Sequence, residues 1–107
     1  MYVTNPQNND VLLGRGGKHF MNAGNMILRK RAKEMVPSFI EASKREKKMI
    51  IDSITMDLLQ QGVRFLKCVR PIGAPQYWEE VNDKKSRAKV SQELREAKKA
   101  LTLHMQR

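Results

Sequence analysis

The sequence lacks the features that give many small proteins a covalent or membrane-bound structure. Its 107 residues include one cysteine, Cys68, which excludes an intramolecular disulfide. No apolar run exceeds three residues, as in Val11–Leu13, so we expect no transmembrane segment. The first ten residues have neither the basic start nor the apolar stretch of a secretory signal. We therefore expect an intracellular domain that non-covalent packing holds together.

Residues suited to catalysis are also scarce. The two histidines, His19 and His104, and the thiol of Cys68 have no spacing typical of a metal site. Cys68 stands in a strand-like segment, which favours a buried, inert thiol over a nucleophile. Glu79 and Glu80 are adjacent, and in a strand they would point to opposite faces rather than form a carboxylate pair. The sequence therefore predicts no enzyme activity, no metal and no cofactor.

Positive charge, by contrast, is abundant. The 21 lysines and arginines outnumber 11 acidic residues, which gives a net charge of +10 and a pI of about 10.1. This excess predicts an acidic partner, and a nucleic acid before an anionic membrane. One Trp, two Tyr and three Phe are few for a protein that stacks on unpaired bases. Duplex DNA is therefore the preferred partner over single strands or RNA.

Turn residues and apolar spacing divide the chain into a flexible lead-in, residues 1–9, and one basic domain, residues 10–103. The expected elements follow in order: a brief strand at 10–13, a helix at 26–35 that Pro37 stops, a helix from Ser43 to Gly62, a hairpin at 63–81 and a helix from 84 to about 103. The order is β-α-α-β-β-α. This pattern predicts an α+β fold that is winged-helix-like and has a long C-terminal helix.

The clearest local signal is the start of the second helix. Ser43 and Glu46 have the spacing of a capping box, and Gly62 suits the left-handed residue that follows such a helix. Phe65 and Trp78 could stack on unpaired bases, although packing onto a helix is the commoner role for hairpin aromatics. The residues expected to form one core are Ile51, Ile54, Leu58, Phe65, Trp78 and Leu94.

A glycine loop follows the first strand, with the sequence Gly-Arg-Gly-Gly-Lys at residues 14–18. Its backbone amides can approach an anion, with Arg15 and Lys18 alongside. It is not a P-loop, because the glycine spacing differs and His19 stands where that motif needs Ser or Thr. Three interpretations stay open: a tight turn that uses the backbone freedom of glycine, a contact to a phosphate backbone and, less favoured than these, a bound nucleotide.

Basic residues cluster at the starts of the second and last helices, where they oppose the helix dipole and so favour a bound anion. In helix-turn-helix proteins the second helix enters the major groove by its N-terminal residues. A hairpin tip would then reach phosphates or the minor groove. The predicted nucleic-acid contacts are Arg15 and Lys18 in the glycine loop, Lys44, Arg45, Lys47 and Lys48 in the second helix, Arg64, Lys67 and Arg70 in the hairpin, and Lys84 and Arg87 in the last helix.

Several spaced segments resemble a known family. In chain order they are Asn9–Gly17, Gly24-Asn25, Lys44–Lys47, Gly62–Lys67, Trp78–Val81 and Ala88–Arg95. Together they resemble a domain of unknown function that recurs in proteins of diatoms and related algae. The resemblance covers about residues 9–96. It implies a discrete domain of nuclear regulatory proteins and transfers no established activity.

Charge, element order and resemblance lead to one preferred function and one alternative. The preferred function is a nuclear domain for transcription regulation, which contacts duplex DNA through phosphates, with the major groove as a further contact. The alternative is a protein-interaction module that docks a partner or a second copy. It would use an apolar stripe on the last helix: Val90, Leu94, Ala97 and Leu101. No membrane partner is expected.

Overall fold

The structure is a computed structural model that describes residues 2–14 and 21–105. In these residues the chain forms three helices, α2 (Ala23–Glu41), α3 (Lys44–Gln60) and α4 (Asp83–Met105). It also forms a four-stranded sheet in the order β1-β4-β3-β2, with β1 (Tyr2–Val3), β2 (Val11–Leu13), β3 (Phe65–Val69) and β4 (Tyr77–Glu80). The predicted α+β class, the long C-terminal helix and the order β-α-α-β-β-α, which here follows β1, are confirmed.

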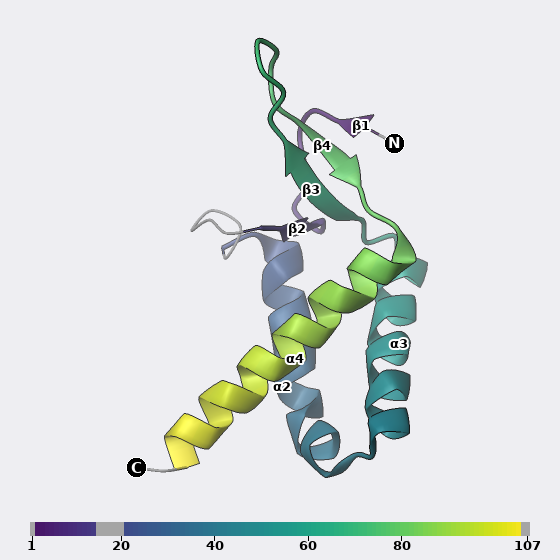
Figure 1. Ribbon diagram of the computed structural model, residues 1–107, viewed down its shortest axis with the longest axis vertical. Coiled ribbons are helices and arrows are strands. Elements are labelled where there is room, and N and C mark those ends of the chain that lie inside the picture. The colour runs from purple at the N-terminus through teal and green to yellow at the C-terminus, as the bar shows by residue number, and fades with distance from the viewer. Residues whose placement is uncertain (1, 15–20, 106–107) are drawn as a thin grey trace.

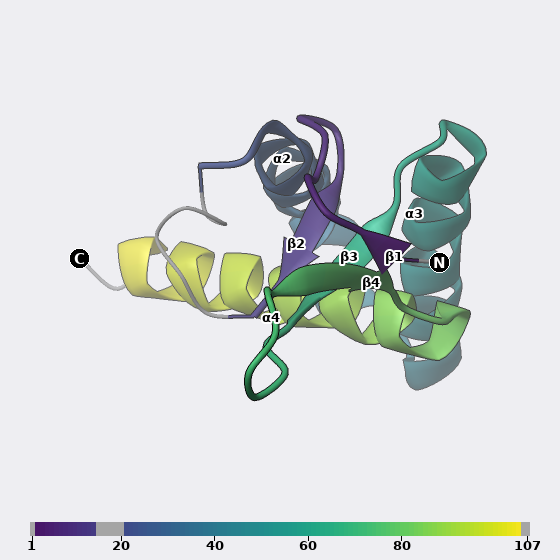
Figure 2. The same ribbon diagram turned by 90° about the horizontal axis from the view of Figure 1, so that it is seen from above.

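Helices and hairpin occupy opposite parts of the molecule (Figure 1). α2 runs away from the sheet, and α3 returns beside it toward the sheet. α4 crosses these two helices obliquely, and its C-terminal end extends past α2. The turn between α2 and α3 and the tip of the β3–β4 hairpin therefore lie at opposite ends of the longest axis, which extends over 47 Å. Seen from above, α4 lies on one side of α2, and the hairpin tip projects to that same side (Figure 2).

The sheet combines the predicted hairpin with two short outer strands. β3 and β4 pair antiparallel, with Cys68 opposite Trp78. β2 pairs with β3 in parallel, so α2 and α3 form the crossover that parallel strands need. β1 lies in the lead-in that the sequence predicts to be flexible, and it pairs antiparallel with β4. A strand of two residues is too short to show the alternation by which a sequence reveals strands.

α3 begins and ends as the sequence predicts. The Ser43 hydroxyl accepts a hydrogen bond from the Glu46 amide at 3.2 Å, and the Ser43 amide donates to the Glu46 carboxylate at 3.0 Å. These bonds satisfy amides that the start of a helix leaves unpaired. Contacts with Ser43 also lower the pKa of Glu46 from its ordinary 4.5. The hydrogen bond from the Ser43 backbone has the largest effect, and the Ser43 side chain has the next largest. After the helix, Gly62 has a φ of 84°, in the left-handed region that favours glycine.

The capping box predicts a measurable loss of stability on substitution. Ser43→Ala should lower the free energy of unfolding by about 1 kcal/mol, because the Glu46 amide loses its acceptor. Since the folded pKa of Glu46 is depressed, its share of the stabilisation is present at neutral pH and is lost as the pH falls through that pKa. Ser43→Ala keeps the larger of the two contacts, that from the Ser43 amide, and removes the side-chain contact, so its cost in urea unfolding should be only slightly smaller at about pH 3 than at about pH 7. Wild-type stability of this variant at both pH values would contradict the role of the cap.

α2 is longer than predicted at both ends, and the expectation that Pro37 stops it is wrong. A proline in a helix interior removes one backbone hydrogen bond and costs about 3 kcal/mol. Beyond Pro37, however, Phe39 is buried in the core. Full burial of such a side chain contributes about 1.5–3 kcal/mol. Packing of the last turn of α2 therefore offsets a large part of the cost of the proline.

The apolar residues form two cores rather than the single core that the sequence predicts. The main core lies between the sheet and the helices and includes four of the expected residues, Ile54, Leu58, Phe65 and Leu94. A fifth, Ile51, is partly buried against them. Trp78 is buried as expected, but it packs with Leu12 and Leu66 in a second cluster. Phe65 and Leu66 are neighbours in β3, so their side chains point to opposite faces of the sheet. Both faces of the hairpin therefore carry buried apolar residues.

Candidate nucleic-acid interface

Side chains at the start of α2 hold the end of β2, from which the glycine loop departs. The buried side-chain amide of Asn25 donates to the Leu12 carbonyl at 2.9 Å and accepts from the Leu12 amide at 2.8 Å. Asn25 thus satisfies the backbone of β2 as a neighbouring strand would. Gly24 permits this close packing, because a Cβ there would lie 2.2 Å from the Asp10 carbonyl oxygen. The start of the glycine loop is therefore fixed to α2.

A buried ion pair fixes the other side of β2. Asp10 is fully buried and accepts hydrogen bonds from Arg64 Nε at 3.0 Å, from Arg64 Nη2 at 2.8 Å and from the Gln7 amide at 2.7 Å. The hydrogen bonds to Asp10 raise the pKa of Arg64 above its ordinary value. The sequence placed Arg64 among the DNA contacts. In the structure its guanidinium binds Asp10, and it joins the start of β2 to the start of β3.

A cleft of about 340 Å³ lies between the end of β2 and α4. We call it the basic cleft, and its lining residues are Leu13, Gly14, Lys85, Ala88, Lys89, Gln92 and Arg95. Lys85 and Arg95 are exposed, whereas the nearly buried Lys89 places its ammonium 3.0 Å from Glu93. No acidic side chain is among the lining residues within the described part of the chain. The glycine loop thus begins at a cleft with two exposed cations.

The exposed side of α4 continues this positive charge. We call it the open face, and it consists of Lys84, Lys85, Ala88, Gln92, Arg95 and Lys99, which are all exposed. From Lys85 onward these residues follow at three- and four-residue steps, so they share one side of the helix. Val90 and Leu94 occupy the opposite side and are fully buried. The open face therefore consists of four cations and two neutral residues, and the exposed Glu96 borders it one turn after Gln92.

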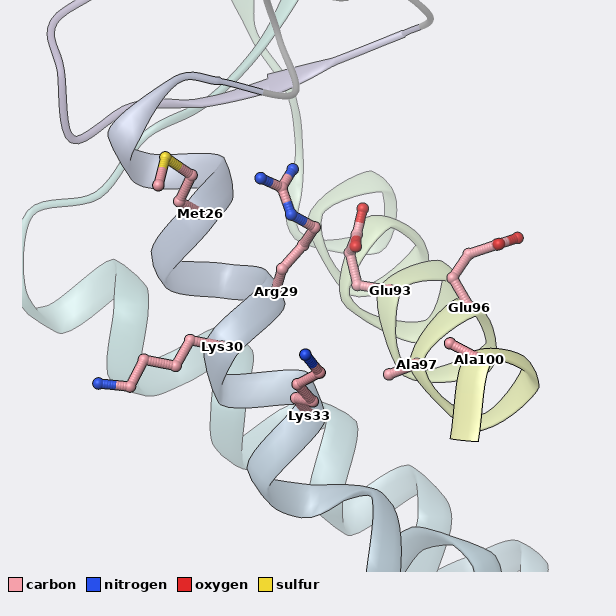
Figure 3. Close-up of a pocket in the computed structure, with 8 residues that line it drawn as sticks. All are labelled: Met26, Arg29, Lys30, Lys33, Glu93, Glu96, Ala97 and Ala100. Atoms are coloured by element: carbon pink, nitrogen blue, oxygen red, sulfur yellow. The ribbon is translucent and has the colours of Figure 1, made fainter. Parts of the chain in front are cut away.

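Two acidic residues of α4 lie at another groove. Glu93 and Glu96 line a second groove, of about 540 Å³, between α4 and α2. Across this groove, Arg29 and Lys33 extend from α2 toward α4 (Figure 3). The remaining lining includes Met26, Ala97 and Ala100, so the groove is apolar between its charged walls. Glu93 is half-buried, whereas Glu96 is exposed and its carboxylate points away from α2 (Figure 3).

The basic residues at the start of α3 lie far from the hairpin. Lys44, Arg45 and Lys48 are exposed, while the Lys47 ammonium lies 5.3 Å from the centre of the Phe39 ring. Because α3 runs antiparallel to α2, its first turn is at the end of the molecule opposite the hairpin tip (Figure 1). A winged-helix arrangement would bring these two regions to one short stretch of DNA. The structure does not bring them together.

The other predicted contacts are placed as follows. Lys67 and Arg70 are exposed in the hairpin, whose tip bends to the side of α4 (Figure 2). Arg87 is exposed, and its Nε lies 3.7 Å from a carboxylate oxygen of Asp52 in α3. Arg15 and Lys18 lie outside the described residues.

Of the open face, the predicted contacts included Lys84 alone and missed Lys85, Ala88, Gln92, Arg95 and Lys99. Sequence reasoning counted basic residues where they cluster at helix starts, and Arg95 and Lys99 stand singly along the helix. The helical spacing of the apolar stripe held the missing signal. Once Val90 and Leu94 are assigned to the core, the residues on the opposite side follow from the helical repeat.

That apolar stripe is mostly used inside the domain. Val90 and Leu94 are fully buried in the main core, and Ala97 packs against it. Leu101 is half-buried near the projecting end of α4. Only the C-terminal part of this stripe, at Leu101, is therefore accessible to a partner.

The described residues contain neither a metal site nor a membrane-spanning helix. In residues 2–14 and 21–105, no group of three or more His, Cys, Asp or Glu side chains is arranged to hold a metal ion. No helix in these ranges combines the length and the apolar character that crossing a membrane requires.

The model of a family described as domain of unknown function (DUF6824) matches residues 10–96. The chain belongs to this family. The DUF6824 match extends from Asp10 of the buried ion pair to Glu96 of α4, so it includes the basic cleft and most of the open face. No curated protein and no solved structure matches the chain.

Proposed function

We propose that this domain binds duplex DNA through its phosphates, with the open face of α4 and the basic cleft as the contact surface. Transcription regulation in the nucleus is the role that we propose for this binding. The exposed cations of α4 support the proposal most directly, because Lys84, Lys85, Arg95 and Lys99 outnumber the exposed acidic residues of this helix, Asp83 and Glu96. The net charge of +10 adds long-range attraction to a polyanion.

The basic cleft offers complementary contacts to a phosphate. The Arg95 guanidinium can donate to two phosphate oxygens, and the Lys85 ammonium supplies a compact point charge. Gly14, with a φ of 104°, allows the backbone to approach a ligand without a side chain between them. Arg15 and Lys18 follow Gly14 in the sequence and add two cations to this segment. Arg70 directly follows β3 in the hairpin, whose tip bends to the same side as α4 (Figure 2).

Salt dependence is the direct test of phosphate binding. If about five to eight phosphates are neutralised, log K should fall with log[salt] with a slope of about −4.5 to −7. Substituting Arg95→Gln together with Lys99→Gln removes two contacts and should make this slope shallower by about 1.8. Fluorescence anisotropy of a labelled duplex at several salt concentrations measures both quantities.

The matched control is Lys44→Gln together with Lys48→Gln. Like the first pair, it removes two exposed positive charges that lie four residues apart on a helix. This pair should leave the slope nearly unchanged, because the start of α3 is not part of the proposed surface. Equal effects of the two double variants would mean that binding depends on the overall charge of the domain, or that α3 also contacts the DNA. Absence of binding to any duplex at about 50 mM salt would contradict the proposed function.

A further inference from the structure

The cations of the open face form two groups with neutral residues between them. Lys84 and Lys85 form the first group, Arg95 and Lys99 form the second, and Ala88 and Gln92 lie between them. At 1.5 Å rise per residue, the helix advances about 15 Å from Lys85 to Arg95. The major groove of B-DNA is about 12 Å wide, and its two phosphate backbones lie just outside this width. When the helix axis is tilted across the groove, this spacing suits one cationic group on each backbone.

The neutral middle of the open face suits the interior of the groove. Ala88 is small and exposed, so it allows close approach to the base edges. Gln92 is exposed, and its side-chain amide has one acceptor oxygen and an NH₂ donor. This pair matches the N6 amino group and the N7 atom of adenine, which glutamine contacts in a bidentate manner.

The position of α4 leaves this side accessible. In Figure 1, α4 lies in front of α2 and α3, and no other labelled element covers it. A helix is about 10–12 Å in diameter and enters the major groove, whereas the minor groove, about 6 Å wide, excludes it. The hairpin tip lies on the same side of the molecule as α4, where it can contact the adjacent backbone (Figure 2).

We infer that α4 enters the major groove of duplex DNA, with its two cationic groups on the two backbones and with Gln92 in contact with an adenine. This inference rests on the proposed function and adds sequence recognition to it. Gln92 is thus a specificity-determining residue, while the cations supply affinity that does not depend on sequence. The start of α3, with Arg45, has no part in base recognition.

The test begins with selection of a preferred site from random duplexes by the full chain. The selected and a scrambled duplex are then titrated with the wild-type chain, with Gln92→Ala and with Gln60→Ala, which removes an exposed glutamine from α3. Gln92→Ala should reduce preference for the selected site about 5- to 150-fold, the range that corresponds to about 1–3 kcal/mol for a bidentate base contact. Its affinity for the scrambled duplex should stay within about twofold of wild type. Gln60→Ala should change neither quantity.

A modified base then identifies the contact. Replacing the recognised adenine with 7-deazaadenine, which lacks N7, should weaken wild-type binding and leave Gln92→Ala binding unchanged. Equal losses for Gln92→Ala on both duplexes would overturn base recognition by this residue. So would a loss of preference in Arg45→Lys with none in Gln92→Ala. Duplex binding without any selected site would overturn the inference and keep the proposed function, whereas absence of duplex binding would remove both.

Discussion

Replacing Phe65 with alanine should lower the free energy of unfolding by about 3–5 kcal/mol, a large part of the stability of a small domain. The ring is 1% exposed and lies in the main core, where β3 meets the helices. Truncation removes its apolar contacts and leaves a cavity that the strand and helices cannot close completely. Ile54→Ala, in the same core, should cost about 2–5 kcal/mol.

Urea unfolding of Phe65→Ala measures this effect, with Ile72→Ala as the control. Ile72 is fully exposed at the tip of the hairpin, so its truncation should change stability by less than about 0.5 kcal/mol. A melting temperature of Phe65→Ala equal to that of wild type would mean that the ring is exposed. That result would restore base stacking as a role for Phe65.

Replacing Arg64 with methionine should lower the free energy of unfolding by about 3 kcal/mol, because it leaves the buried carboxylate of Asp10 without its partly exposed cation. Asp10 would then keep the hydrogen bond from the Gln7 amide and lose both bonds from the guanidinium. Because Asp10 is fully buried, the loss of these two bonds leaves much of the charge of its carboxylate uncompensated.

Lys67→Met is the matched control, since it removes a cation from the same hairpin at an exposed position. This control should change stability by less than about 0.5 kcal/mol. The pair of variants also separates structure from binding, because Arg64→Met should not reduce the salt slope of DNA binding at temperatures where it is folded. A stable Arg64→Met with a shallower salt slope would return Arg64 to the DNA contacts.

The elements that sequence reasoning predicted correctly are those that local chemistry determines. The capping box of Ser43 and Glu46 involves residues three apart, and the left-handed conformation of Gly62 depends on its own backbone. Pro37 shows the limit of this approach. Its cost is local and can be predicted, but the burial of Phe39 that offsets it depends on packing against other elements.

The candidate site was harder to predict because it depends on distant residues. Gly14 meets Lys85 and Arg95 only through the packing of β2 beside α4. Arg64 resembles any other basic hairpin residue in the sequence, and its role is set by Asp10, which lies 54 residues earlier. Trp78 was correctly predicted to be buried, but the two-sided burial of the hairpin placed it away from Phe65.

The short outer strands have a consequence for behaviour at high concentration. A sheet edge with a long row of unpaired backbone groups can recruit another molecule and start aggregation. Here the longer strands, β3 and β4, are central, and the edges are β1 and β2, with two and three residues. Asn25 also occupies the amide and the carbonyl of Leu12 in the middle of β2. The sheet therefore offers a second chain very little backbone to extend, and mutual repulsion between molecules of charge +10 acts in the same direction.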